Sequence, residues 1–189
     1  MKKFELTSET KINIFGKKLF RIKALVSFGV VKTGETGGWV EKEENVNQSG
    51  DAWVFDNAEV FDNARVFGNA EVSGNARVFG DAWVFDNAWV SGNARVFGNA
   101  EVSDNAWVSG NAEVSDNADY ATIHGFGTQF RTTTFFRCKD KQVKVSCGCF
   151  YGTIPEFCEQ VKNTRKGKIA EEYLMIADLM EKHFAEEAK

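Results

Sequence analysis

Four cysteines are the first candidates for metal chemistry in this sequence. Cys147 and Cys149 are separated by a single glycine, and Cys138 and Cys158 lie on either side of that pair. Structural zinc sites usually have two to four residues between paired cysteines, and this close pair has one. We therefore expect no metal and no other cofactor, and predict that the thiols fill a core between a hairpin and a helix. Without an apolar export segment they should stay reduced in a cytoplasm.

His124 is the candidate for acid–base chemistry, because imidazole titrates near neutral pH. It stands in the glycine-rich run 123–127, where a lone histidine is most often only exposed to solvent. The sequence holds one further histidine, His183. Two histidines cannot supply the three imidazole ligands of a His₃ zinc centre, so zinc carbonic anhydrase chemistry is excluded.

Both candidates follow a long repeat that forms the middle of the chain. Over residues 51–118 the phrase Ala-x-Val-Phe/Ser-Gly/Asp-Asn recurs, with valine at every sixth position. Alanine and valine are two residues apart, so on a strand they point to the same face. The Gly/Asp-Asn pair suits a corner, since Gly and Asn tolerate positive φ. Three such sides predict an eighteen-residue triangular coil, and fixed-period self-similarity indicates a solenoid of stacked coils.

The repeat resembles the hexapeptide-repeat left-handed parallel β-helix. Residues 20–25, 37–41, 134–137 and 145–150 also resemble bacterial and phage β-solenoid proteins of the YdcK type. The resemblance implies a mainly β fold, with the left-handed twist coming from the family and not from the spacing. It brings no established reaction. It implies a phage or prophage accessory protein that acts on a host component.

The flanking segments predict caps for the two open ends of the solenoid. Residues 4–25 read as a β-hairpin around Gly16, and the glycines at 34, 37 and 38 read as a loop. Residues 47–50 interrupt the six-residue period and predict a bulge or loop in the first coil. Unpaired strand edges recruit other chains, so a cap at each end is expected.

The C-terminal cap is predicted to be a small α+β unit. Residues 123–127 read as a linker, residues 132–150 as a second hairpin, and Thr153 with Glu156 as the capping box of the first of two helices. The expected domains are an N-terminal cap at 1–38, a β-helix at 39–120 and a C-terminal cap at 121–189.

Stacking at eighteen residues sorts the outward side chains into columns. One column contains Trp53, Glu71, Trp89 and Trp107, another places Arg77 beside Arg95 between two glutamates, and asparagines form a corner ladder. The glutamates beside Arg77 and Arg95 predict a ladder of ion pairs. Outward aromatic residues are too many for a free surface, so the termini or a second copy should cover some of them. The candidate partner-binding residues are Trp53, Trp89, Trp107, Glu71, Arg77 and Arg95.

These features favour a non-enzymatic protein-binding solenoid. Inward and corner positions hardly vary, whereas the outward position changes among Trp, Glu, Arg and Asp, as in solenoid recognition surfaces. The expected partner is a host protein in a bacterial cytoplasm, with anti-defence activity as one version. A homo-oligomer, dimer or trimer, is also expected. No stretch is apolar enough to predict a membrane span.

Two other functional hypotheses remain open, imitation of DNA by the acidic rod and an acyltransferase activity. Residues 51–119 contain twelve acidic residues against three arginines, a net charge of −9, so direct nucleic-acid binding by the rod is unfavourable. The same charge permits imitation of DNA. The rival is a hexapeptide-repeat acyltransferase, with His124 as base and an acyl-CoA donor.

Overall fold

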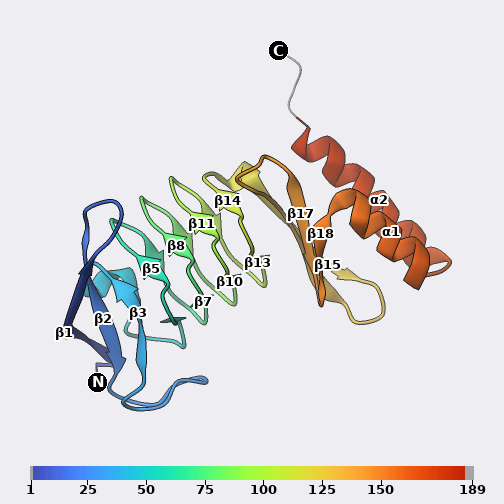
Figure 1. Cartoon of the computed structure of the whole chain (residues 1–189). Helices are drawn as coiled ribbons and strands as arrows, with labels where there is room; N and C mark the ends of the chain where they lie inside the picture. The colour runs from blue at the N-terminus through green and yellow to red at the C-terminus, as the bar shows by residue number, and fades with distance from the viewer. Residues whose placement is uncertain (1, 186–189) are drawn as a thin grey trace.

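The computed structural model describes residues 2–185. The middle of the chain forms a rod of stacked coils, with an antiparallel hairpin at one end and a sheet carrying two helices at the other (Figure 1). The predicted order of hairpin, solenoid and α+β unit is therefore present, while the exact domain boundaries stay predictions.

The rod consists of two-residue strands in three parallel sheets. Sheet neighbours are eighteen residues apart, as in the pairs Trp89–Trp107 and Val66–Val84, which confirms the eighteen-residue coil. Its strands are β4 Trp53–Val54, β5 Glu59–Val60, β6 Arg65–Val66, β7 Glu71–Val72, β8 Arg77–Val78, β9 Trp83–Val84, β10 Trp89–Val90, β11 Arg95–Val96, β12 Glu101–Val102, β13 Trp107–Val108 and β14 Glu113–Val114. The handedness of the coil stays a prediction.

The inside of the rod is lined by the repeated alanines and valines. From Ala52 to Val114 they have exposed fractions of 0 or 1% and belong to one hydrophobic cluster. The inward register predicted from the two-residue spacing is thus confirmed. At the corners the residue before asparagine adopts positive φ, as at Asp56 (53°) and Gly74 (67°). Ala118, the last alanine of the period, is exposed within the short 3₁₀ helix η2 (Asn117–Asp119), because the coil ends there.

The N-terminal hairpin continues one sheet of the rod. Strands β1 (Phe4–Ile12) and β2 (Lys18–Ala24) pair antiparallel, and β3 (Thr36–Val40) pairs antiparallel with β2 and parallel with β5. The loop predicted at Gly37 and Gly38 is wrong: both lie buried in β3. A Cβ on Gly37 would lie 2.6 Å from Cζ2 of Trp53, so glycine lets this strand approach the first coil. The 3₁₀ helix η1 (Glu43–Asn45) precedes the predicted irregular segment at 47–50.

The C-terminal sheet has four antiparallel strands in sequence order. They are β15 Tyr120–Phe126, β16 Arg131–Arg137, β17 Val143–Cys147 and β18 Phe150–Thr153. The prediction of a linker at 123–127 is therefore wrong, and the unit has four strands where a two-stranded hairpin was predicted. Gly125 and Gly127 adopt positive φ and the register shifts between Ile123 and Phe126, so the glycines mark an irregular strand end.

Two helices cover this sheet, and the predicted capping box starts the first of them. In α1 (Ile154–Thr164) the Thr153 side chain accepts from the Glu156 N–H, and α2 (Lys168–Phe184) packs beside it. Their apolar faces meet Phe135 and Val145 of the sheet in a second hydrophobic cluster. Neither helix in residues 2–185 has the length and apolarity needed to cross a bilayer.

Candidate interaction face

The most exposed part of the tryptophan column is a stacked pair on neighbouring coils. The rings of Trp89 and Trp107 have centroids 5.1 Å apart and planes 7° from parallel. Each indole N–H donates to a serine hydroxyl of the preceding coil, Trp89 to Ser73 at 3.2 Å and Trp107 to Ser91 at 3.4 Å. Trp89 nevertheless remains 41% exposed. Because the ring faces lie against each other, the pair presents indole edges to the outside, which favours contact with apolar or aromatic groups.

Trp53 belongs to the same column but is not part of a free surface. It points outward from the first coil, yet its exposed fraction is 0%. Phe4 and Phe28 of the N-terminal segment cover it edge-on, with centroids 5.8 and 5.3 Å away. Its selection as a partner-binding residue was wrong, because the sequence does not reveal which segment folds over which column.

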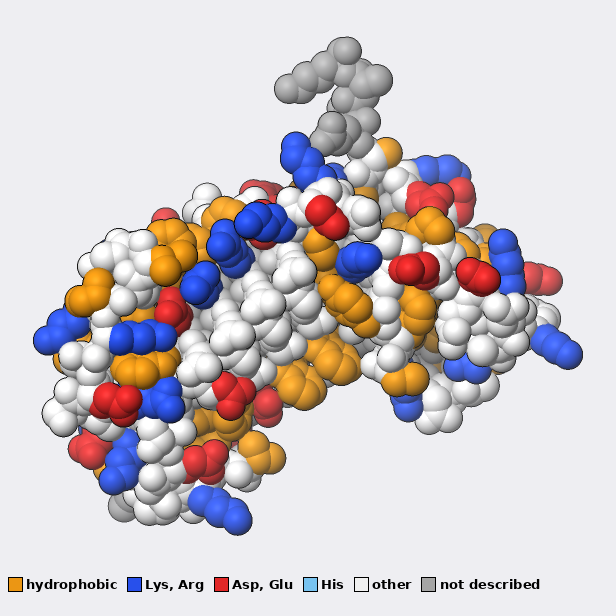
Figure 2. All heavy atoms as spheres, in the orientation of Figure 1, with side chains coloured by type: hydrophobic (Ala, Val, Ile, Leu, Met, Phe, Trp, Pro, Cys, Tyr) orange, Lys and Arg blue, Asp and Glu red, His pale blue; other side chains and the backbone are white. Residues whose placement is uncertain are grey.

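The surface of the pair continues onto the C-terminal sheet. A hollow of about 250 Å³ lies beyond Trp107 and is lined by Ser109, Gly110, Phe150 and Tyr151, among others. Tyr151 is 47% exposed. Figure 2 shows hydrophobic side chains along the edge where the rod meets this sheet. We call Trp89, Trp107 and Tyr151 the Trp face. Glu71 is the strand neighbour of Trp89 on the other side and adds a carboxylate at its border. Sequence reasoning missed Tyr151, since its position depends on how the cap docks.

A second aromatic surface lies on another side of the rod. Trp83 is 40% exposed and meets the ring of Phe67 edge-on at 5.9 Å, while Phe67 and Phe85 stack at 4.9 Å. A groove of about 460 Å³ runs here beside η1 and includes Glu43, Glu44 and Arg65 in its lining. We call Trp83, Phe67 and Phe85 the Trp83 surface. It provides an equally exposed tryptophan with which the Trp face can be compared.

The arginine column forms the predicted ladder of ion pairs. Nε of Arg77 lies 3.2 Å from the Glu59 carboxylate, and Nη1 of Arg95 lies 3.3 Å from that of Glu113. Lys11 of the hairpin adds a second cation 2.8 Å from Glu59. Arg77 and Arg95 thus hold carboxylates of their own chain, which makes them weaker candidates for partner contact than the tryptophans.

The asparagine ladder is present from Asn75 through Asn93 to Asn111, with amide contacts of 3.3 and 3.4 Å.

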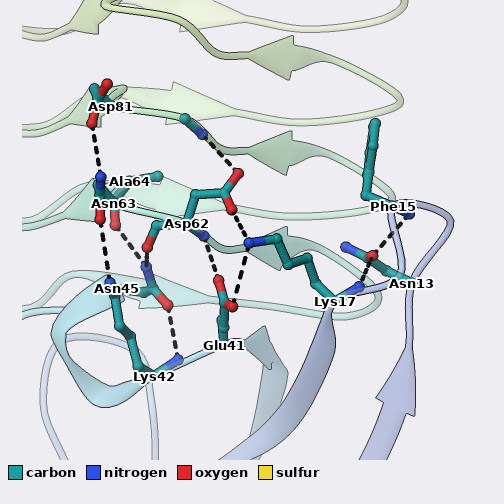
Figure 3. A network of polar contacts seen from close by, with 11 residues as sticks. Asn13, Phe15, Lys17, Glu41, Lys42, Asn45, Asp62, Asn63, Ala64 and Asp81 are labelled. Carbon is teal, nitrogen blue, oxygen red and sulfur yellow. Dashed lines mark hydrogen bonds and ion pairs between the residues drawn. The ribbon is translucent and has the colours of Figure 1, made fainter.

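A polar network joins the hairpin to the first coils (Figure 3). Lys17 contacts Asp62 at 2.5 Å and Glu41 at 3.6 Å, and the hydrogen bond with Asp62 is the main reason why the pKa of Lys17 is raised. Asn45 donates to the Ala64 carbonyl at 2.9 Å. These contacts bind the cap to the rod and leave no obvious role for these residues in chemistry.

The cysteines do not meet at one site. Cys138 packs into the rod core, where burial raises the pKa of its thiol to about 11. Cys147 and Cys158 are half-buried against the helices, and Cys149 is exposed in the β17–β18 turn. The prediction that all four fill one hairpin–helix core was therefore wrong for Cys138 and Cys149. Within residues 2–185 no three His, Cys, Asp or Glu side chains group as metal ligands.

His124 lies exposed on β15. Its Nδ1 is 3.2 Å from the Thr132 hydroxyl on the neighbouring strand. This contact is an ordinary cross-strand pair of side chains in a β-sheet. Among the described residues, neither a carboxylate nor a thiol forms a hydrogen bond with the His124 ring.

Comparison with known proteins supports the resemblance drawn from the repeat. A family model described as the YdcK beta solenoid repeat matches residues 70–86, about one coil of the rod. No curated protein matches the chain. The matched coil and the stacked parallel strands agree, and the chain is a β-solenoid protein that carries the YdcK-type repeat.

Proposed function

We propose that this protein is a non-enzymatic scaffold that binds another protein through the Trp face. The observation that carries the proposal is the stacked pair Trp89–Trp107, whose N–H groups are satisfied within the rod while Trp89 stays 41% exposed. An exposed indole costs free energy in water, and tryptophan is enriched among the residues that dominate binding energy at interfaces.

The chemistry around the pair defines the partner. An apolar knob fits against the indole edges and the hollow beyond Trp107. The rod that surrounds it has a net charge of −9 over residues 51–119, so a basic rim on the partner would speed association and orient it. The proposed partner is therefore a protein with an exposed apolar group in a basic surround.

The family resemblance supports a more specific setting, in which a phage or prophage encodes the protein and its partner is a host protein in the bacterial cytoplasm. Anti-defence activity belongs to this proposal. Imitation of DNA is a narrower version, supported by the net charge of −9 over residues 51–119. The corner acids lie on three columns, represented by Asp56, Asp62 and Asp86. Recognition through the Trp face does not depend on that version.

Capture from a bacterial lysate tests the proposal. The wild type, the double variant Trp89→Ala/Trp107→Ala and the variant Trp83→Ala serve as baits, and captured proteins are identified by mass spectrometry. We expect a protein that wild type and Trp83→Ala retain and the double variant loses. Trp83 is the matched control because its exposed fraction, 40%, equals that of Trp89 to within one per cent. Equal capture by all three baits would contradict the proposal.

Acetyl-CoA distinguishes the acyltransferase alternative. We expect it to leave the melting temperature unchanged. Saturable stabilisation that disappears in His124→Ala would support the transferase and overturn the non-enzymatic proposal.

A further inference from the structure

A pocket in the C-terminal unit lies where three connections meet. They are the β15–β16 connection, the β17–β18 turn and the end of α1. The pocket has a volume of about 410 Å³, within the usual range for small-molecule sites. It is a separate hollow from the one beyond Trp107, although Cys149 and Phe150 of the turn line both.

The inner wall of this pocket is aromatic. Phe157 and Tyr173 are 3% and 8% exposed and meet edge-on at 5.7 Å, and Phe150 lies beside Phe157 at 5.4 Å. The Tyr173 hydroxyl donates to the Phe126 carbonyl at 3.2 Å, so its polar end is satisfied. The wall offers a flat ring an apolar contact.

Two arginines form the rim, and no acidic residue is among the described residues that line the pocket. Nη1 of Arg131 lies so close to Gly148 that a Cβ there would collide with it, which places the guanidinium over the β17–β18 turn. Arg165 ends α1 on the opposite connection. Neither arginine forms an ion pair with another residue of the described range 2–185, in contrast to Arg77, Arg95 and Arg137 of the rod and its junction.

Both arginines act electrostatically on the same buried hydroxyl. Burial, followed by Cys147, raises the pKa of Tyr173, while Arg165 and Arg131 oppose the increase. Both positive charges therefore lie within electrostatic range of the Tyr173 hydroxyl. The neutral donors Thr128, Gln129 and Gln160 complete the rim, whereas the Thr164 hydroxyl donates to the Gln160 carbonyl at 2.6 Å.

We infer that this pocket binds a small phosphate monoester that carries a ring. Two guanidinium groups match the charge of a phosphate monoester. By analogy with phosphorylated side chains, that charge is about −1.5 to −2 at neutral pH. The hydroxyl and amide donors fit its remaining oxygens, and the ring lies against the aromatic wall. A carboxylate would use only one of the two arginines fully, because a bidentate pair satisfies its charge.

Calorimetric titration of the full chain tests this inference with three probes. Phenyl phosphate supplies both ring and phosphate, inorganic phosphate supplies the anion alone, and phenol supplies the ring alone. Adenosine 5′-monophosphate in a parallel titration distinguishes a nucleotide from a simpler aryl ester. We expect phenyl phosphate or the nucleotide to bind more tightly than inorganic phosphate, and phenol not to bind. Affinity should fall as salt is added, because the contacts are partly exposed ion pairs.

The variants Arg131→Gln and Arg165→Gln should each weaken binding about tenfold or more, since a hydrogen bond to a charged group contributes at least that factor. Lys166→Gln is the matched control, because it removes the neighbouring exposed cation outside the lining and should bind as wild type does. Circular dichroism checks that each variant is folded; if one arginine variant is not, the other carries the comparison. Absence of binding by both ring phosphates, or equal affinity in the two arginine variants and wild type, would overturn the inference. Trp89→Ala/Trp107→Ala should retain phosphate binding, which separates this test from that of the Trp face.

Discussion

At the scale of single residues, Val84 represents the interior of the rod. It has an exposed fraction of 0% and packs between Val66 and Val102 of the neighbouring coils. Val84→Asp removes about 1.5–3 kcal/mol of burial and adds a charge without a partner, so we expect it to unfold the centre of the rod. Thermal unfolding followed by circular dichroism measures the effect. Trp83→Asp, which places the same charge on the adjacent outward position, is the control. Melting of Val84→Asp like that of wild type would contradict the inward register.

The buried Lys3 predicts that the stability of the protein depends on pH. Its ammonium group is buried and donates to the Gly50 and Ala52 carbonyls at 3.2 and 2.8 Å. Burial lowers its pKa to about 8, against the opposing effect of Asp51. Between pH 8 and the ordinary lysine value the unfolded chain binds more protons than the folded one, so the contribution of Lys3 to stability rises with pH.

The comparison of wild type with Lys3→Met isolates this contribution from other groups that titrate in the same range. Urea unfolding at pH 7.5 and about pH 10 should show the stability of wild type increasing relative to that of the variant. Parallel behaviour would show that the Lys3 side chain keeps its ordinary pKa in the folded protein, and a relative decrease would show that folding raises it; either result contradicts the prediction.

Residue-level prediction from the sequence works where a repeat period determines the surroundings. The direction of Val84 and the pairing of Arg77 with Glu59 depend only on spacings of two and eighteen residues, and both are confirmed. The burial of Trp53 depends on Phe4 and Phe28, which have no periodic relation to it. The position of Tyr151 and the pocket lined by Arg131 and Arg165 also depend on contacts without a periodic relation, so the sequence did not predict them.

At the scale of elements, the N-terminal hairpin covers part of a phenylalanine column. Phe15 at its tip lies 5.5 Å from Phe61 and 5.2 Å from Phe79. Phe61, which also packs against Leu19 and Trp39, is 1% exposed. The N-terminal hairpin therefore covers this column in part, which agrees with the expectation that the termini or a second copy cover some outward aromatic residues. Phe15→Ala should lower stability by about 1–3 kcal/mol, since it removes two aromatic pairs that each contribute about 0.5–1.5 kcal/mol beyond their buried area.

Ile14→Ala is the matched control for this hairpin. Ile14 neighbours Phe15 but is 71% exposed. Chemical denaturation should leave Ile14→Ala near wild type and shift the midpoint of Phe15→Ala downward. Equal midpoints for the two variants would mean that the tip does not stabilise the rod.

Helices and strands were predicted correctly where the sequence signal lies within a few neighbouring residues. The capping box of α1 is contained in four residues and is confirmed. Strands β3 and β15 were misjudged because glycine is normally a turn residue. In β3 glycine instead allows close approach to Trp53, and in β15 it ends the strand at a register shift.

At the scale of the whole molecule, two aromatic surfaces remain open, and we assign them different partners. We expect the Trp83 surface to join copies into a closed dimer or trimer, because its groove of about 460 Å³ carries both Arg65 and the acidic pair Glu43 and Glu44. Light scattering should report an oligomer for wild type and Trp89→Ala/Trp107→Ala, and a smaller mass for Trp83→Ala. A monomeric wild type at high concentration would contradict self-association.

The affinity of a captured partner shows whether the Trp face binds a protein. Calorimetry with the purified partner should show that Trp89→Ala/Trp107→Ala weakens binding about thirtyfold or more, as expected when residues that dominate an interface are truncated at a cost of at least about 2 kcal/mol. Trp83→Ala should bind within about twofold of wild type, as expected of a residue outside the contact. An unchanged affinity in the double variant, or a loss confined to Trp83→Ala, would rule out binding through the Trp face.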